Sequence, residues 1–371
     1  MTTPRSEPAA STAHGAMQSA DIDVRLVEVA HFDHQVTGVS VTEDGRIFVN
    51  FPRWTEDTEV SVAELLPDGS LRPYPDAHWN SWRNAKKNAL SPDDRWVCVQ
   101  SVVADGRGSL WVIDPAAPAA AFLVQGGPKL VRIDLANDSI AQTIAFDEQV
   151  AREGSYLNDV RLGSDGRYAY ITDSGTRGAL VVVDIESGRA RRVLDGHPST
   201  QLEKDVVVKH HGREIRRTDG RGVEFSSDGI ALSPDGETLY WQAVTGRTLY
   251  RIATRVLQDE SLSEDEVADA VQRVGENGVA DGLWIDPQGR MYISALEDDA
   301  IRVRDGERVE MFLQDERLRW PDTFSQGPDG TMYVTASRIM DSIWHDPDAP
   351  PRLSTTLFRF TPDDASAARP H

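Results

Sequence analysis

The stretch YLNDVRLGSDGRYAYITDSG, residues 156–175, carries the pattern that decides the fold. Its Asp-Gly turn at 165–166 follows a short apolar run at 160–162 and precedes alternating aromatic and β-branched residues at 168–172. This arrangement predicts a tight hairpin whose second strand is half-buried. Two more strands are expected at 179–185 and 191–194. Four antiparallel strands in about 40 residues are typical of one propeller blade.

The same turn and strand recur along the chain. The six copies are EDGRIFVN from Glu43, PDDRWVCV from Pro92, SDGRYAYI from Ser164, PDGETLYW from Pro234, PQGRMYIS from Pro287 and PDGTMYVT from Pro328. We therefore predict an all-β, six-bladed β-propeller of four-stranded antiparallel blades, as a single domain over residues 21–362. Because a closed ring hides its sheet edges, an N-terminal strand at 24–29 should pair with a C-terminal strand at 356–360. Residues 1–20 and 363–371 are expected to be tails, the first of them disordered.

The charge balance argues against nucleic acid and membrane surfaces as partners. The chain has 39 Lys and Arg against 60 Asp and Glu, and its formal charge of -21 would repel phosphate backbones and anionic lipids. No apolar run reaches the roughly 18 residues that span a bilayer, and the N-terminus lacks the apolar segment of a secretory signal. We therefore expect a cytoplasmic protein, monomeric or dimeric, that binds a small molecule.

One position in each blade can face the shared central channel. Counting back eight residues from each turn glycine, or from Asp94 where the glycine is missing, gives Thr37, Lys86, Asn158, Asp228, Asp281 and Asp322. Asp and Asn also favour strand starts, because they bond nearby backbone N–H groups, so a structural role stays open. The convergence of these positions on one axis favours a functional role, because three carboxylates around a narrow axis repel one another unless they are protonated or matched by a cation. The neighbouring Asp159 is expected only to cap the start of its strand.

Oxygen-only ligands predict a hard divalent cation, with Ca²⁺ first and Mg²⁺ or Zn²⁺ as alternatives. Such an ion would polarise a carbonyl or acidify a water, while Asp281 or Asp322 acts as general acid/base and Lys86 positions the substrate. Without a metal, the carboxylates would suit a cationic amine framed by aromatic rings. The candidate framing residues, most of which should serve packing instead, are Trp54, Trp79, Trp82, Trp241, Trp320 and Trp344.

Two insertions are candidate lids or covers of a blade edge. The first, from His197, is charged and contains His210 and His211, which we expect to be solvated loop residues rather than metal ligands, because adjacent residues of an extended segment point in opposite directions. The second, residues 262–278, predicts a short helix. Ser263 and Glu266 have capping-box spacing, and Gly275 marks the expected stop.

Several segments together resemble the yellow and major royal jelly protein family. They are GRIFVNFPRW, SLRPYPDAHWN, PKLVRIDL, YLNDVRL with AYITDSG, GIALSPDGETLYWQAVTGRTLYRIAT, DGLWIDPQGRMYIS, and WPDTF with DGTMYVT, in that order. The resemblance covers residues 29–335 and implies a six-bladed propeller. That family includes dopachrome-converting enzymes, binders of biogenic amines and proteins without known catalysis, so it implies fold more closely than function.

The blade starts are also similar to the gluconolactonase, senescence-marker and luciferin-regenerating propellers. By that similarity, Asn158 corresponds to a channel asparagine near the substrate, and Asp228 stands where those proteins often have a metal-binding asparagine. Asp281 matches their metal-binding aspartate, which also serves as general base. Thr37 stands at the place of their fourth ligand, a glutamate, which implies weaker metal binding here.

These observations lead to one main hypothesis and two alternatives. The main hypothesis is an enzyme whose cation is held by Asn158, Asp228 and Asp281. It would hydrolyse a lactone or perform a dopachrome-type isomerisation, with Thr37, Lys86, Asn158 and Trp320 contacting the substrate. The first alternative is a non-catalytic binding protein for an aromatic amine in the same channel, and the second is a purely structural or partner-binding propeller.

Overall fold

The computed structural model describes residues 23–118 and 122–362, so both predicted tails lie outside the described residues. Six four-stranded antiparallel sheets surround a central axis, as predicted. From the innermost to the outermost strand, the first blade consists of β2 (Gly38–Val41), β3 (Ile47–Asn50), β4 (Val62–Leu65) and β5 (Leu71–Pro73). The second consists of β6 (Ser101–Ala104), β7 (Ser109–Asp114), β8 (Lys129–Asp134) and β9 (Ser139–Ala145). The third consists of β10 (Leu157–Leu162), β11 (Tyr168–Asp173), β12 (Ala179–Asp184) and β13 (Arg189–Val193).

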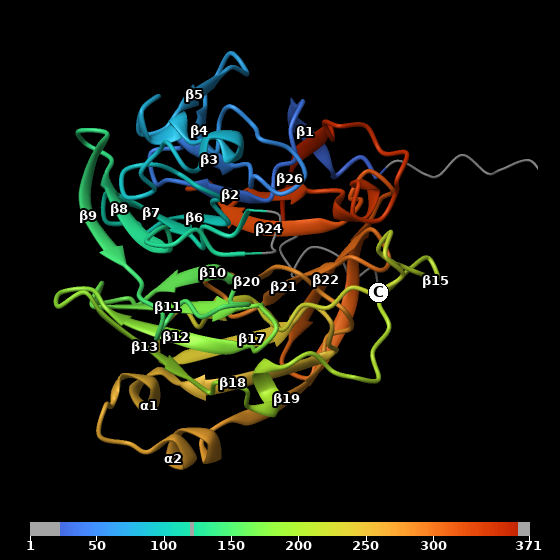
Figure 1. The fold of residues 1–371 in the computed structure, drawn as a ribbon. Helices are drawn as coiled ribbons and strands as arrows, with labels where there is room; N and C mark the ends of the chain where they lie inside the picture. Colours follow the sequence, from blue (N-terminus) through green and yellow to red (C-terminus); the bar gives the residue numbers. More distant parts are fainter. Residues whose placement is uncertain (1–22, 119–121, 363–371) are drawn as a thin grey trace, which may run out of the picture.

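Blades four to six follow the same order. The fourth consists of β16 (Ser227–Leu232), β17 (Thr238–Ala243), β18 (Thr248–Ala253) and β19 (Gln272–Glu276). The fifth consists of β20 (Leu283–Ile285), β21 (Met291–Ala295), β22 (Ala300–Asp305) and β23 (Arg308–Gln314). The sixth consists of β24 (Pro321–Gln326), β25 (Met332–Ala336), β26 (Thr355–Phe360) and β1 (Val27–Phe32). Figure 1 shows β2, β6, β10 and β20 near the centre and β5 and β9 at the periphery.

The sixth blade closes the ring with both ends of the chain. Strand β1 pairs antiparallel with β26, and Phe32 lies opposite Thr355. The prediction that an N-terminal strand joins a C-terminal one is confirmed, although the N-terminal strand begins three positions later than expected. Closure joins the two ends of the chain within one sheet, in which β1 is the outermost strand.

Apolar side chains fill the spaces between neighbouring blades. Between the second and third blades, Ile113 and Leu130 pack against Val160 and Ile171. Between the sixth and first, Leu357 packs with Val49. Because strand residues alternate between two faces, each blade buries both of its faces against the next, and the wedge-shaped sheets are held around the axis.

Two local predictions were wrong. The turn at 92–95 does not form the second hairpin; that turn lies between β6 and β7 at 105–108. The apolar residues that follow the turn at 92–95 do not form the expected strand. The Asp114 carboxylate accepts hydrogen bonds from two of them, Val97 N (2.7 Å) and Cys98 N (2.9 Å). These bonds occupy backbone donors that a strand would have used.

The predicted helix at 262–278 is also shorter than expected. Helix α2 spans Glu264–Asp269 and has the predicted capping box, but the residues after it form β19. Pairing with β18 therefore overrides the helical pattern that continued to Gly275. With α1 (Thr254–Gln258), α2 covers the outer edge of the fourth blade (Figure 1). No described helix is long and apolar enough to cross a membrane.

Candidate active site

Three of the predicted channel residues, Asn158, Asp228 and Asp322, stand at β-bulges of the innermost strands. In β10, Leu157 pairs with Asp173 and Val160 with Ile171, so two residues of β10 oppose the single Thr172. The same irregularity occurs in β16 and β24. The residue pairs that form these bulges are Asn158 with Asp159, Asp228 with Gly229, and Asp322 with Thr323. A bulge changes the direction of its side chains, which explains how a strand start presents a polar group to the axis.

Hydrogen bonds link these bulges from blade to blade. Thr172 Oγ1 donates to the carbonyl of Asp228 in the next blade (2.7 Å). Thr335 Oγ1 donates in the same way to the carbonyl of Thr37 (2.6 Å). In the first blade, Asn50 Nδ2 donates to the carbonyl of Gln100 (3.1 Å). The axial residues are therefore held by the neighbouring blade as well as by their own.

This pattern shows that the prediction of Lys86 as the channel residue of the second blade was wrong. Gln100 occupies the second-blade position that corresponds to Thr37 and Asp228. Asn50 donates to the Gln100 carbonyl. In the same way, Thr335 donates to the carbonyl of Thr37, and Thr172 donates to that of Asp228. Lys86 lies instead on an exposed 3₁₀ helix, η2 (Asn84–Lys86), far from any innermost strand start in sequence. The misplaced turn at 92–95 caused the error.

The axial carboxylate cluster consists of Asp159, Asp228, Asp281 and Asp322, all at least nine-tenths buried. Asn158 Nδ2 donates to Asp228 Oδ2 at 2.6 Å, and Asp228 is hydrogen-bonded to Asp281. Burial, with the charges of Asp281 and the other cluster carboxylates, raises the pKa of Asp228 well above its usual value. Burial and the charges of Asp281 and Asp159 do the same to the pKa of Asp322.

Asp281 is the member of the cluster poised to titrate near neutrality. Burial raises its pKa to about 7, against the opposing effect of a hydrogen bond from Trp320. Trp320 Nε1 donates to Asp281 Oδ2 at 2.6 Å. A carboxyl group with a pKa near 7 can act as general acid or base at physiological pH, since both of its protonation states are populated.

Asp159 was expected to cap its strand, and the structure places it within the axial cluster instead. Burial raises its pKa, while Arg161, whose Nη2 lies 3.9 Å from Asp159 Oδ2, lowers it. Its charge in turn contributes to the raised pKa values of Asp228, Asp281 and Asp322. The bulge explains this placement, because it interrupts the strict alternation of side chains along β10.

Thr37 is fully buried but differs from the other channel residues in its contacts. Its Oγ1 accepts a hydrogen bond from Asn50 Nδ2 (3.0 Å).

The residues after Asp228 and Asp281 are glycines because the backbones approach closely there. A Cβ on Gly229 would lie 2.2 Å from the carbonyl oxygen of Asp281, and one on Gly282 would lie 2.0 Å from that of Asp322.

An apolar cluster lies at the end of the ring where the innermost strands begin. We call it the lid cluster: Trp54, Val206, Val208, Ile215, Val223, Phe225, Val244, Val279, Leu296, Trp320, Ile339, Met340 and Trp344. Five of its members come from the first insertion, which was predicted to be a lid or a cover of a blade edge. Trp54 and Trp344 are in ring contact (centroids 5.2 Å apart), and Trp54 Nε1 donates to the Tyr156 hydroxyl, which donates to Gln100 Oε1 at 2.8 Å. Trp79, Trp82 and Trp241 pack in other clusters.

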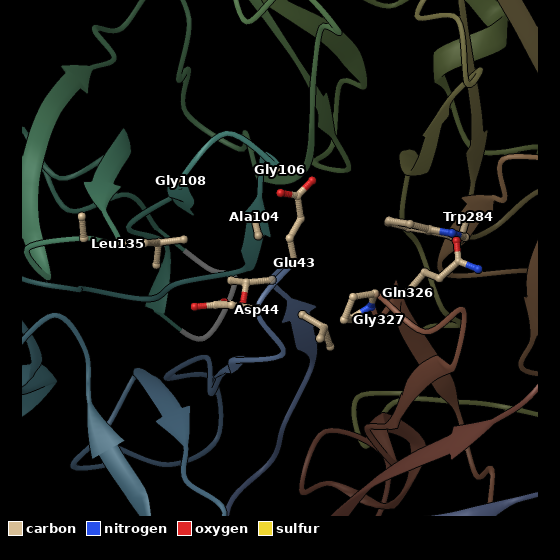
Figure 2. Close-up of a pocket in the computed structure, with 13 residues that line it drawn as sticks. Glu43, Asp44, Ala104, Gly106, Gly108, Leu135, Trp284, Gln326 and Gly327 are labelled. Carbon is tan, nitrogen blue, oxygen red and sulfur yellow. The ribbon is translucent and has the colours of Figure 1, made fainter.

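A cavity of about 530 Å³ lies at the opposite end, where the innermost strands finish. Figure 2 shows Trp284 on one side of it, with Glu43, Asp44 and Gln326 among the polar residues around it. The Arg161 guanidinium lies over the Trp284 ring, 5.9 Å from its centroid, and also faces Asp159. Trp284 and Arg161 thus stand between the cavity and the axial carboxylate cluster.

A second polar group lies outside the axis. In residues 23–118 and 122–362, His210, His211 and Asp299 are the one trio of His, Cys, Asp or Glu side chains whose ligand atoms lie within 4.8 Å of one another. No trio of axial carboxylates meets this limit. The expectation that the two histidines point apart was wrong. His211 has a positive φ of 46°, in the turn between β14 (Lys209–His210) and β15 (Arg213–Glu214), so both rings face Asp299.

The sequence of this fold matches a known family. Residues 97–349 match the sequence model of the major royal jelly proteins. The chain belongs to the major royal jelly protein family. Protein yellow of Drosophila erecta and of Drosophila melanogaster are each 23% identical to it over 280 residues, which cover 69% of this chain and 48% of theirs. This family member therefore spans about half the length of the curated relatives that it matches.

Solved structures extend the likeness of this major royal jelly protein to other six-bladed propellers. A gluconolactonase of Xanthomonas campestris has a TM-score of 0.53 at 13% identity, covering 91% of this chain and 89% of its own. A luciferin-regenerating enzyme has 0.54 at 10%, over 91% and 95%. A calcium-binding regucalcin of Agrobacterium tumefaciens has 0.52 at 14%, over 90% and 93%. At such identities the likeness shows the fold alone.

Proposed function

We propose that this protein is a small-molecule enzyme that hydrolyses a lactone at the axial carboxylate cluster. The observation that carries the proposal is the burial of Asp228, Asp281 and Asp322 in one cluster, where Asp281 accepts a hydrogen bond from Trp320 and has a pKa raised to about 7, and where burial and the neighbouring carboxylates raise the pKa values of Asp228 and Asp322. Neighbouring carboxyl groups with different proton affinities supply a base and an acid at the same pH. The four carboxyl groups are buried, so their charges act in a medium of low dielectric constant.

The proton transfers follow from these affinities. The Asp281 carboxylate accepts a proton from the water that attacks the lactone carbonyl. The ring C–O bond then breaks, and protonated Asp322 donates its proton to the leaving alkoxide oxygen, giving the hydroxy acid. The indole N–H of Trp320 stabilises the ionised state of Asp281 by donating a hydrogen bond to its carboxylate. Lys86 takes no part in this proposal, because it is exposed outside the channel.

The same site fits a divalent cation through its donor atoms. Asn158, Asp228 and Asp281 are buried and carry side-chain oxygens; Asp228 accepts a hydrogen bond from Asn158 Nδ2 and is hydrogen-bonded to Asp281, and Arg161 is a cationic group beside the cluster at Asp159. A hard cation held by these three residues would polarise the lactone carbonyl. Thr37 offers less than a carboxylate would, since its hydroxyl is engaged by Asn50.

A panel of γ- and δ-lactones tests the proposal by continuous titration of the acid released. We expect turnover in the presence of Ca²⁺, Mg²⁺ or Zn²⁺ that EDTA suppresses. The variant Asp281→Asn should lose at least about 100-fold in kcat, since general acid/base catalysis contributes that much. Asp329→Asn, which alters an exposed turn carboxyl, is the matched control. Equal rates for Asp281→Asn and wild type would exclude the proposed role.

Binding of an aromatic amine is the second candidate function. The lid cluster brings Trp320 against Asp281 and also contains Trp54 and Trp344, and aromatic rings next to anions suit a protonated amine. Calorimetric titration with dopamine and serotonin tests it. Saturable binding that Asp281→Asn weakens, with no turnover of any lactone, would favour the amine binder over the hydrolase.

A further inference from the structure

The trio outside the axis joins two separate parts of the fold. His210 and His211 belong to the β14–β15 hairpin of the first insertion, whereas Asp299 lies in the turn between β21 and β22 of the fifth blade. His210 Nε2 and His211 Nε2 each lie 2.8 Å from the same atom, Asp299 Oδ2. Three donor atoms from two elements thus converge on one point.

Backbone conformation brings the side chains together at a cost. His211 and Asp299 both have positive φ values, 46° and 50°, which residues other than glycine rarely adopt. With Gly212 at φ 81°, His211 forms a two-residue hairpin turn, a place that normally favours Asn-Gly. Residues held in this region point to a functional constraint when the structure supports them independently.

Hydrogen bonds to the fifth blade supply that support. Glu297 receives Lys209 N at its Oε1 (2.9 Å) and His211 N at its carbonyl (3.0 Å). Glu297 also forms an ion pair with Arg247 (3.0 Å). The hairpin is therefore positioned next to Asp299 by contacts that do not involve either imidazole.

Hydrogen bonding alone leaves this group incompletely satisfied. Asp299 is 2% exposed, and its Oδ1 has no hydrogen-bond partner, while Oδ2 receives both imidazoles. A buried acceptor without a partner destabilises the folded state, because its lost hydration is not replaced. A cation between the three side chains would engage the carboxylate and both imidazole lone pairs.

The ligand types identify the class of ion. Two imidazoles and one carboxylate with an open fourth position suit a borderline transition-metal ion such as Zn²⁺, whereas Ca²⁺ and Mg²⁺ prefer oxygen ligands alone. Tetrahedral ligands about 2.0–2.1 Å from zinc lie about 3.3 Å apart, so the observed separations of 2.8 Å need to open only slightly.

One positive group stands beside the trio. Arg319 Nη1 lies 3.4 Å from both ring nitrogens of His210, so the guanidinium covers one face of that ring. Its charge is already matched, because Arg319 Nε donates to both oxygens of Asp341 (2.8 and 2.7 Å). Arg319 precedes Trp320, so the trio adjoins the lid cluster.

We propose that His210, His211 and Asp299 form a zinc site that fastens the first insertion to the fifth blade. The hairpin is flanked by Val208 and Ile215, two members of the lid cluster that are joined by a backbone bond from Ile215 N to the Val208 carbonyl (3.0 Å). Zinc bound here would hold the lid cluster closed over the channel. The site is separate from the axial carboxylate cluster and does not depend on the reaction proposed for it.

Zinc binding to the purified full chain tests this site directly. Titration against a chromophoric chelator should give one Zn²⁺ per chain, and Co²⁺ should give the visible absorption bands of a tetrahedral site with nitrogen ligands. His211→Asn should weaken Zn²⁺ binding at least about 100-fold, because it removes one of the ligands. Asparagine tolerates the positive φ at this position, so the turn should survive.

The control is His31→Asn, which removes an exposed histidine of β1 and should bind Zn²⁺ as wild type does. Hydrogen exchange of residues 206–216 should slow on adding Zn²⁺ to wild type, and His211→Asn should not respond. Failure of wild type to bind Zn²⁺ would overturn the proposal, as would equal affinity of folded His211→Asn. Zinc held only by the axial cluster would give that second result.

Discussion

Trp320 Nε1 lies 2.6 Å from Asp281 Oδ2, and this hydrogen bond joins the lid cluster to the axial carboxylate cluster. Trp320 adopts a positive φ of 53°, unusual for a large aromatic residue, and its side chain is 1% exposed. Such a conformation costs about 1–3 kcal/mol and persists only where its surroundings enforce it. Here it directs an N–H donor to a carboxylate, which limits how far burial raises the pKa of Asp281.

Replacing Trp320 with Phe should raise the pKa of Asp281 above about 7. The change removes the donor that favours the ionised carboxylate, and a hydrogen bond to a charged group is worth about 1.5–3 kcal/mol, or about one to two pKa units. Carboxyl ¹³C NMR titration measures the shift. Trp344→Phe, in the same lid cluster, is the control and should leave the titration unchanged. An unaltered titration in Trp320→Phe would show that the indole does not tune Asp281.

Asp281 should make the protein less stable as the pH rises from about 4 to about 7. In that window the folded state keeps a proton on Asp281 that the unfolded state has released, so the free energy of unfolding falls with increasing pH. The expected contribution approaches one proton, or about 1.4 kcal/mol per pH unit.

Urea denaturation of wild type and Asp281→Asn across this range checks the prediction. The variant cannot titrate at this position, so its stability should depend less steeply on pH. Parallel pH dependences in the two proteins would contradict the raised pKa.

Gly282→Ala should destabilise the protein by about 3 kcal/mol or more, because overpacking of a tight site costs this much when backbone must move. The added Cβ would lie 2.0 Å from the carbonyl oxygen of Asp322. Chemical denaturation gives the change in unfolding free energy. Gly222→Ala is the matched control, since a Cβ there meets nothing within 4 Å. Similar stabilities of the two variants would mean that the blades separate easily at the axis.

Ca²⁺ should raise the melting temperature of wild type, and EDTA should reverse the effect. A ligand that binds only the folded state stabilises it by about 2.7 kcal/mol at 100 times its Kd. The effect should grow with pH, because Asp228 and Asp281, whose pKa values are raised, must release protons to bind a cation.

Asp228→Asn should lose most of this stabilisation, whereas His211→Asn should retain it, since His211 lies at the other group. Melting curves with and without Ca²⁺ for the three proteins decide the point. A Ca²⁺ response that survives in Asp228→Asn would place the cation elsewhere.

Local chemistry accounts for the parts of the fold that could be predicted. An Asp-Gly turn and the alternation beside it act over a few residues, so β10 to β13 appear close to their predicted positions. The alignment on those turns also identified Asn158, Asp228, Asp281 and Asp322, since each stands at a constant distance from its hairpin. It failed at Lys86, where a plausible turn in a long loop replaced the real one at 105–108.

The sequence by itself determined the repeated hairpins, the closure of the ring by both termini, and the oxygen-bearing residue at most blade starts. Only the tertiary structure decided which side chains meet. A bulge brought Asp159 into the axial cluster, a positive φ directed His211 towards Asp299, and another positive φ directed the Trp320 indole to Asp281. Desolvation and Coulomb interactions depend on distances between blades, which no local pattern contains, so the proton affinities of the site arise only when the ring closes.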